Sequence, residues 1–98
     1  MKNRIVSITK EDIKNAGSYC DNGGCLLATA MKREGYTGIS CGPGYVSTSE
    51  GSFTFSKRAE RKIFRSYPGD PNNRGDILGG VTPRKDAKPF QVILHPRP

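Results

Sequence analysis

The residues best suited to chemistry in this chain are basic side chains gathered in one short segment. Between positions 57 and 65 the sequence places five cations against a single carboxylate, Glu60. Four of these cations recur at intervals of three and four residues, which puts them on one face of a helix: Arg58, Arg61, Lys62 and Arg65. Guanidinium groups bind phosphate oxygens through paired hydrogen bonds, so this spacing predicts an anion-binding surface. The competing interpretation is an ordinary solvated helix face.

A second candidate anion site is a pair of glycines before another predicted helix. Gly23 and Gly24 directly precede the segment that begins at Cys25. Glycine lets a phosphate approach free backbone N–H groups, and the helix dipole favours its negative charge. The spacing matches neither the P-loop nor the dinucleotide fingerprint. A flexible connection into an ordinary helix start therefore explains the same residues.

Three cysteines and one histidine supply the ligand types of a Cys₃His zinc site: Cys20, Cys25, Cys41 and His95. The first two are widely spaced for a zinc pair, so packed thiols and a strand-end histidine are the simpler interpretation. A Cys25–His95 nucleophile pair is a further alternative, although nothing in the sequence brings the two together. An odd number of cysteines fits a reducing cytoplasm better than a disulfide framework. We expect no metal and no cofactor.

The remaining polar residues offer no visible catalytic apparatus. Acidic residues in the second half of the chain are scattered without the spacing of a paired acid and base, so we expect a binding protein and not an enzyme. Tyr45 lies between Gly44 and Val46 in a turn-rich stretch, and we expect its ring to be exposed and able to stack on a base. The four phenylalanines are assigned to the core: Phe53, Phe55, Phe64 and Phe90.

Length and composition limit the architecture that positions these residues. The chain has 98 residues, a formal charge of +7, 34% hydrophobic residues and no Trp. This size predicts a single domain over residues 1–98 with a lean core, so we expect a homo-oligomer to supply additional burial. No apolar run is long enough to cross a membrane. The positive charge lies mainly in the second half, which holds ten cations and five carboxylates.

Hydrophobic periodicity predicts the order of elements. Alternation predicts strands at 4–7 and 90–95, with two short strands between 35 and 51 and another at 52–55. Thr9 and Ser56 are expected to cap helices over 10–15 and 57–66, and Gly35 to end a helix that begins at Cys25. A long Gly/Pro-rich loop covers 68–89. The fold class is α+β, with a small antiparallel or mixed sheet of four to five short strands packed with two main helices.

Several of these features together resemble a group of small phage-encoded proteins of unassigned role. The resemblance rests on Ile8–Ile13, on the Cys25-Leu26-Leu27-Ala28 start of an Ala-rich helix, on the basic helix, and on the Pro89-Phe90 opening of the last strand. The group carries Cys-x-x-Cys-Pro before its helix, whereas here Leu26 replaces the proline, the cysteine spacing is wider, and 68–89 looks like an insertion. The resemblance implies a phage origin and a similar fold.

Small basic phage proteins of this kind are also similar to counter-defence proteins that sequester cyclic nucleotide immune signals. By this analogy we expect the chain to hold a small anionic nucleotide in the cytoplasm of the host bacterial cell, without catalysis. The basic helix and the glycines would contact phosphates, Tyr45 a base, and the 68–89 loop would act as a lid. The alternative is a protein that inhibits a host defence complex or binds nucleic acid through the same basic face.

Overall fold

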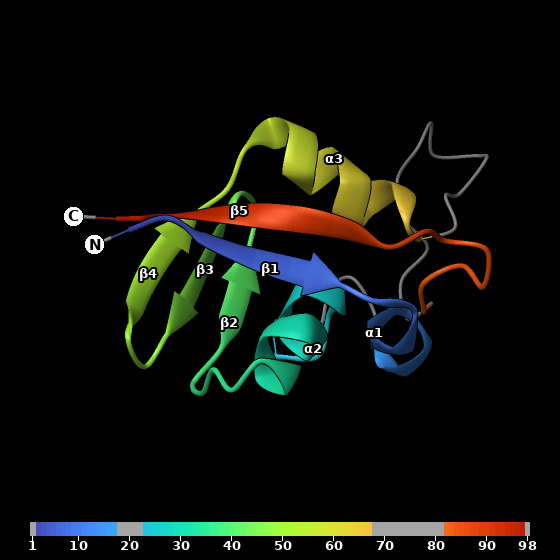
Figure 1. Cartoon of the computed structure of the whole chain (residues 1–98), viewed down its shortest axis with the longest axis horizontal. Coiled ribbons are helices and arrows are strands. Elements are labelled where there is room, and N and C mark those ends of the chain that lie inside the picture. The colour runs from blue at the N-terminus through green and yellow to red at the C-terminus, as the bar shows by residue number, and fades with distance from the viewer. Residues whose placement is uncertain (1, 18–22, 68–81, 98) are drawn as a thin grey trace.

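The computed structural model describes residues 2–17, 23–67 and 82–97, and these form a five-stranded antiparallel sheet with three helices (Figure 1). The elements in chain order are β1 (Arg4–Ile8), α1 (Lys10–Asn15), α2 (Leu26–Arg33), β2 (Ser40–Gly42), β3 (Tyr45–Thr48), β4 (Gly51–Thr54), α3 (Lys57–Arg65) and β5 (Phe90–Pro96). The strand order is β1-β5-β4-β3-β2, so the last strand lies between the first strand and the β2–β4 meander. The predicted α+β class is confirmed, and the sheet is wholly antiparallel.

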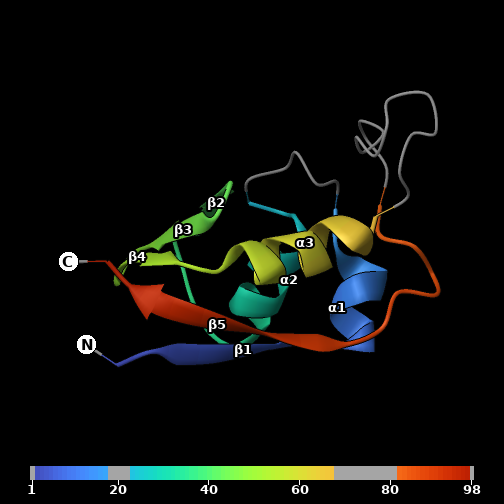
Figure 2. The same cartoon turned by 90° about the horizontal axis from the view of Figure 1, so that it is seen from above.

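The core lies between the sheet and the helices. Figure 2 shows all three helices on one side of the β1–β5 pair. Inward side chains alternate strictly along these strands, with Val6 opposite Val92, while their outward neighbours Ile5 and Ile93 are opposite one another and exposed. Phe53 of β4 continues the buried layer. The alternation read from the sequence therefore identifies the core face of the sheet correctly.

The predicted caps of the helices are confirmed at atomic level. Thr9 and Asp12 form a capping box at α1, in which the Thr9 hydroxyl accepts from the Asp12 amide at 3.2 Å and the Asp12 carboxylate accepts from the Thr9 amide at 2.8 Å. At α3 the Ser56 hydroxyl accepts from the Ala59 amide at 3.1 Å. Gly35 follows α2 with φ of 101°, a conformation that favours glycine at this position.

The prediction that Phe64 of α3 belongs to the core is wrong. Ala59, Ile63 and Tyr67 face the core, but Phe64 is only half-buried. Position 64 lies about 100° around the helix from position 63, which carries its ring to the flank of the buried stripe. Phe90 is also only partly buried, although it packs against the core.

The free edge of the sheet at β1 is partly covered by a side chain from α2. Arg33 donates to the backbone carbonyl of Ser7 at 2.8 Å and to the buried carboxylate of Asp12 at 2.9 Å. One guanidinium thus joins β1, α1 and α2. A charged side chain at an edge strand also opposes pairing with another strand.

Candidate functional site: two grooves beside a basic helix

A strongly basic concavity lies beside the C-terminal half of α3. We call it the basic groove; it measures about 450 Å³, and its lining residues come from two segments: Lys62, Arg65, Ser66, Arg84, Asp86, Ala87, Lys88, Pro89 and Phe90. Four of these side chains are cations and one is a carboxylate. The carboxylate of Asp86 approaches Arg84 only at 3.9 Å and its side chain is 81% exposed, so it neutralises little of the positive charge.

A backbone hydrogen bond brings the two walls of the basic groove together. The Arg84 amide donates to the carbonyl of Ser66, the C-cap of α3, at 2.7 Å. This bond satisfies a carbonyl that the end of a helix would otherwise leave without an intrahelical partner. The segment then turns back through a bond from the Ala87 amide to the Arg84 carbonyl at 3.1 Å, and the buried Pro83 and Ala87 anchor it. Arg84 and Lys88 consequently lie opposite the last turn of α3.

The basic groove contains more positive charge than is needed to complement the negative end of the α3 dipole. The C-terminus of a helix carries about half a negative charge, which Lys62 and Arg65 already complement. Arg84 and Lys88 add two further cations beyond this requirement. The surplus positive potential is suited to a phosphate or carboxylate ligand, which would accept hydrogen bonds from both walls.

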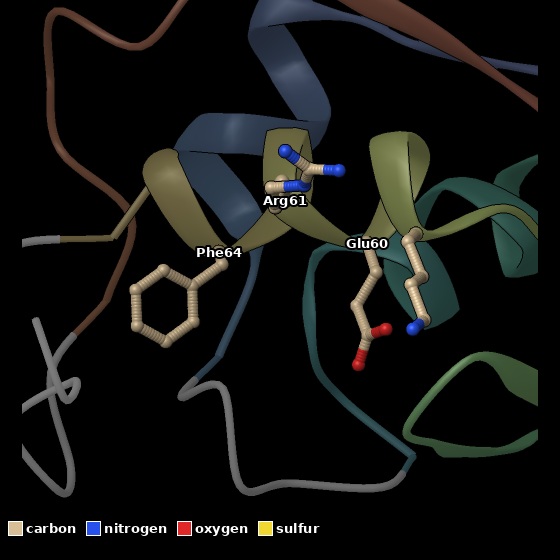
Figure 3. Close-up of a pocket in the computed structure, with 4 residues that line it drawn as sticks. Glu60, Arg61 and Phe64 are labelled. Atoms are coloured by element: carbon tan, nitrogen blue, oxygen red, sulfur yellow. The ribbon is translucent and has the colours of Figure 1, made fainter.

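A smaller depression lies along the other flank of α3. We call it the aromatic groove; it measures about 370 Å³ and is lined by Lys57, Glu60, Arg61 and Phe64. Figure 3 shows the Phe64 ring and the Glu60 carboxylate extending from the same side of the helix, while the Arg61 guanidinium lies across its front. An aromatic face beside a guanidinium suits a planar ring such as a nucleobase.

The structure divides the four basic residues that the sequence assigned to one site. All four are exposed, but Lys62 and Arg65 line the basic groove, Arg61 lines the aromatic groove, and Arg58 lines neither. Tyr45 is 40% exposed, as expected, yet it lines neither of the two grooves. Its ring lies against Gly42, its partner on β2, so closely that a Cβ at position 42 would collide with it.

The glycines before α2 lie at a helix start that already has polar partners. The Leu26 amide donates to the hydroxyl of Tyr67 at 3.0 Å, and the same hydroxyl donates to the carbonyl of Gly17 at 3.0 Å. Among the described residues, a Cβ at Gly23 would meet the Ile39 carbonyl alone, at 3.8 Å, which is an ordinary van der Waals distance. Gly23 and Gly24 line neither groove, and their role in anion binding stays a prediction.

The four residues of the alternative zinc site are not brought together where the structure describes them. Cys25 and Cys41 lie in contact on the core side of the sheet, and their shared hydrogen bond, together with burial, raises the pKa of the Cys41 thiol. His95 is exposed on β5, where the alternation places it on the outer face. Cys20 lies outside the described residues. Among those residues no three His, Cys, Asp or Glu side chains are grouped to hold a metal ion.

Sequence reasoning missed Arg84 and Lys88 as partners of α3. Their charges were visible within the predicted loop, but the contact depends on the bond between Arg84 and Ser66, which no local pattern encodes. Of that loop, residues 82–89 are described and form the groove wall, whereas 68–81, on which the predicted lid depends, lie outside the described residues.

No helix in residues 2–17, 23–67 and 82–97 has the length and apolar character needed to cross a bilayer. No protein-family model, curated protein or solved structure matches the chain.

Proposed function

We propose that this chain is a non-catalytic binding protein that sequesters a small anionic nucleotide, with the basic groove holding the phosphates. The observation that carries the proposal is the convergence of Lys62 and Arg65 with Arg84 and Lys88 around one concavity. Cations that face one another across a groove repel in the absence of a ligand, and a bound phosphate group relieves this repulsion. Arginine on each wall supports bidentate binding.

The aromatic groove supports a role for the base of the same nucleotide. Phe64 and Arg61 both line this groove, on the flank of α3 away from the basic groove. A nucleotide that extends across α3 would reach phosphate-binding cations on one flank and a stacking surface on the other. In the proposed arrangement Phe64 takes the stacking role that the sequence assigned to Tyr45.

Self-association is part of the proposal. Small-molecule sites usually bury most of their ligand, whereas both grooves are open to solvent. A second copy of the chain would supply the missing cover. The exposed Ile5 and Ile93 lie on the face of the sheet that the described helices leave open, on the side away from α3 (Figure 2), so they support an interface between copies but not the cover of the grooves. The proposed role in the host cytoplasm is the removal of a cyclic nucleotide immune signal.

Calorimetric titration tests the proposal with a panel of cyclic di- and trinucleotides and their linear forms. We expect at least one ligand to bind, and the K62Q/R65Q variant to bind it about 10 to 100 times more weakly, the loss expected for one or two charge-assisted bonds. K10Q/K14Q is the matched control, because it removes the same charge from exposed positions on α1. The proposal would be contradicted if no ligand of the panel bound, or if both variants lost the same affinity for the ligand. Chromatography of the ligand after incubation tests the absence of catalysis.

Nucleic acid is the second candidate ligand, because the exposed cations of α3 continue from Lys57 to Arg65 and the grooves do not enclose a small molecule. Four groove cations allow about four phosphate contacts. The logarithm of the binding constant should then fall with the logarithm of salt concentration with a slope of about −3. Tight, salt-dependent binding of single-stranded or duplex nucleic acid, together with no binding of any cyclic nucleotide, would favour this candidate.

A further inference from the structure

The two described cysteines form a pair of thiols between α2 and β2. Cys25 is the N-cap of α2 and is buried, while Cys41 lies at the centre of β2 and pairs with Val46 of β3. Fifteen residues lie between them in the chain. Cys41 packs against the core cluster that contains Cys25, and a hydrogen bond joins the two thiols. The fold therefore holds the two sulfur atoms next to one another.

The surroundings of the pair favour one proton shared between the two sulfurs. The hydrogen bond to Cys25 and burial both raise the pKa of the Cys41 thiol, and the Ala28 amide at the Cys41 sulfur acts weakly in the opposite direction. Cys25 lies at the positive end of the α2 dipole, and the first turn of α2 contains no acidic residue to offset it.

Exposure to solvent distinguishes the two cysteine residues. Cys41 is partly exposed, whereas Cys25 is only 5% exposed. A small disulfide therefore meets Cys41 first, and Cys25 lies within reach of the mixed disulfide that results.

We propose that Cys25 and Cys41 are a reversible dithiol site that is oxidised to an intramolecular disulfide by low-molecular-weight disulfides such as oxidised glutathione. One proton leaves the pair to solvent, the proton that remains is held by Cys25, and the Cys41 thiolate attacks one sulfur of the small disulfide, which releases one glutathione thiolate. Cys25 then gives up a proton and attacks the Cys41 sulfur, which releases the second thiolate. Two protein thiols lose two electrons and two protons, and one oxidised glutathione becomes two reduced glutathione molecules.

The disulfide would tie the start of α2 to the centre of β2 and close the loop between them. Cross-linking a loop of this length restricts the unfolded chain, so the oxidised protein should unfold at a temperature higher by about 10 °C. This property is independent of ligand binding at the grooves.

The test uses the full chain with Cys20→Ser, which leaves the described pair as the chain's remaining cysteines. The native protein is equilibrated at graded ratios of reduced to oxidised glutathione, quenched with acid, alkylated after unfolding and measured by mass spectrometry. We expect a species lighter by two hydrogens with a Cys25–Cys41 linked peptide, a higher unfolding midpoint, and full reversal by dithiothreitol.

A matched variant separates the proposed pair from unspecific thiol oxidation. Cys20→Ser/Cys41→Ser should end as a stable mixed disulfide or as a free thiol at Cys25, without the two-hydrogen loss. The proposal is overturned if the folded Cys20→Ser chain keeps both thiols in a large excess of oxidised glutathione. It is also overturned if the chain stops at the mixed disulfide, because Cys25 is then out of reach of Cys41.

Discussion

Replacing Asp12 by Asn tests how the chain holds α1, α2 and the edge of the sheet together. Asp12 is 2% exposed, and its carboxylate accepts bonds from the Arg33 Nε at 2.9 Å, the Arg33 Nη2 at 3.2 Å, the Thr9 amide at 2.8 Å and the Thr9 hydroxyl at 2.9 Å. An amide presents one oxygen and one NH₂ group to these donors. In either orientation the NH₂ group faces an N–H group, so charge-assisted bonds are lost and a donor is left without an acceptor.

The expected cost follows from these bonds. Charge-assisted hydrogen bonds contribute about 1.5 to 3 kcal/mol each, but the Arg33 side chain is 41% exposed and water replaces part of what it loses. We therefore expect Asp12→Asn to lower the free energy of unfolding by about 2 to 3 kcal/mol and the melting midpoint by about 10 °C. Urea and thermal unfolding followed by circular dichroism at pH 7 measure both. Glu11→Gln, an exposed acid in the same helical turn, is the control and should change stability by about 0.5 kcal/mol at most.

The same carboxylate predicts an acid dependence of stability. Burial alone would raise the pKa of Asp12, but the hydrogen bonds from Arg33 and Thr9 outweigh it and lower the pKa below the ordinary value. A lowered carboxyl pKa contributes stability above the unfolded value of about 3.9, and this contribution is lost as the pH falls through the folded value. The wild type should lose more stability than Asp12→Asn on acidification below about pH 4. Equal stability of the two proteins at pH 7, with parallel acid curves, would refute the argument.

Three further outcomes follow from single contacts. Tyr67→Phe should destabilise the protein by about 1 to 3 kcal/mol in urea unfolding, because the Leu26 amide and the Gly17 carbonyl lose their hydroxyl partner, whereas Tyr45→Phe on the exposed ring should have no effect. Gly42→Ala should displace the Tyr45 ring, seen as an increase in tyrosine accessibility to a fluorescence quencher, and Gly23→Ala should leave it unchanged. Replacing Arg84 and Lys88 by Gln should raise the melting midpoint by about 2 °C at low salt, because repulsion between the cations of the basic groove is reduced. This gain should vanish in concentrated salt. A gain that persists in concentrated salt would contradict repulsion between these cations.

Local sequence signals predicted the elements because each depends on neighbours in the chain. Thr9 and Asp12 form their capping box within one turn, and the alternation of β1 and β5 follows from one buried face. Gly35 ends α2 through its own backbone conformation. Such features need no knowledge of the rest of the molecule, and all were correctly predicted.

The candidate site required contacts between distant segments, and the sequence contains no local signal for these. The basic groove depends on the bond between Arg84 and Ser66, and the start of α2 depends on the hydroxyl of Tyr67, 41 residues beyond Leu26. Phe64 was predicted to lie in the core because residues that flank the buried stripe of a helix recur at the same spacing as residues within it. The placement of β5 between β1 and β4 likewise follows from long-range pairing.

The charge pattern of α3 is better explained by the proposed anion binding than by helix stability. Lys62 and Arg65 in the last turn complement the dipole, but Lys57 and Arg58 in the first turn oppose it, with Glu60 as the only acid there. The fold then adds Arg84 and Lys88 to a groove whose helix end is already neutralised. A sequence selected for stability alone would avoid cations in the first turn of α3 and further cations beside its last turn, since each arrangement places like charges together. Cations in excess of what the helix dipole and Glu60 offset are the expected cost of the proposed anion-binding surface.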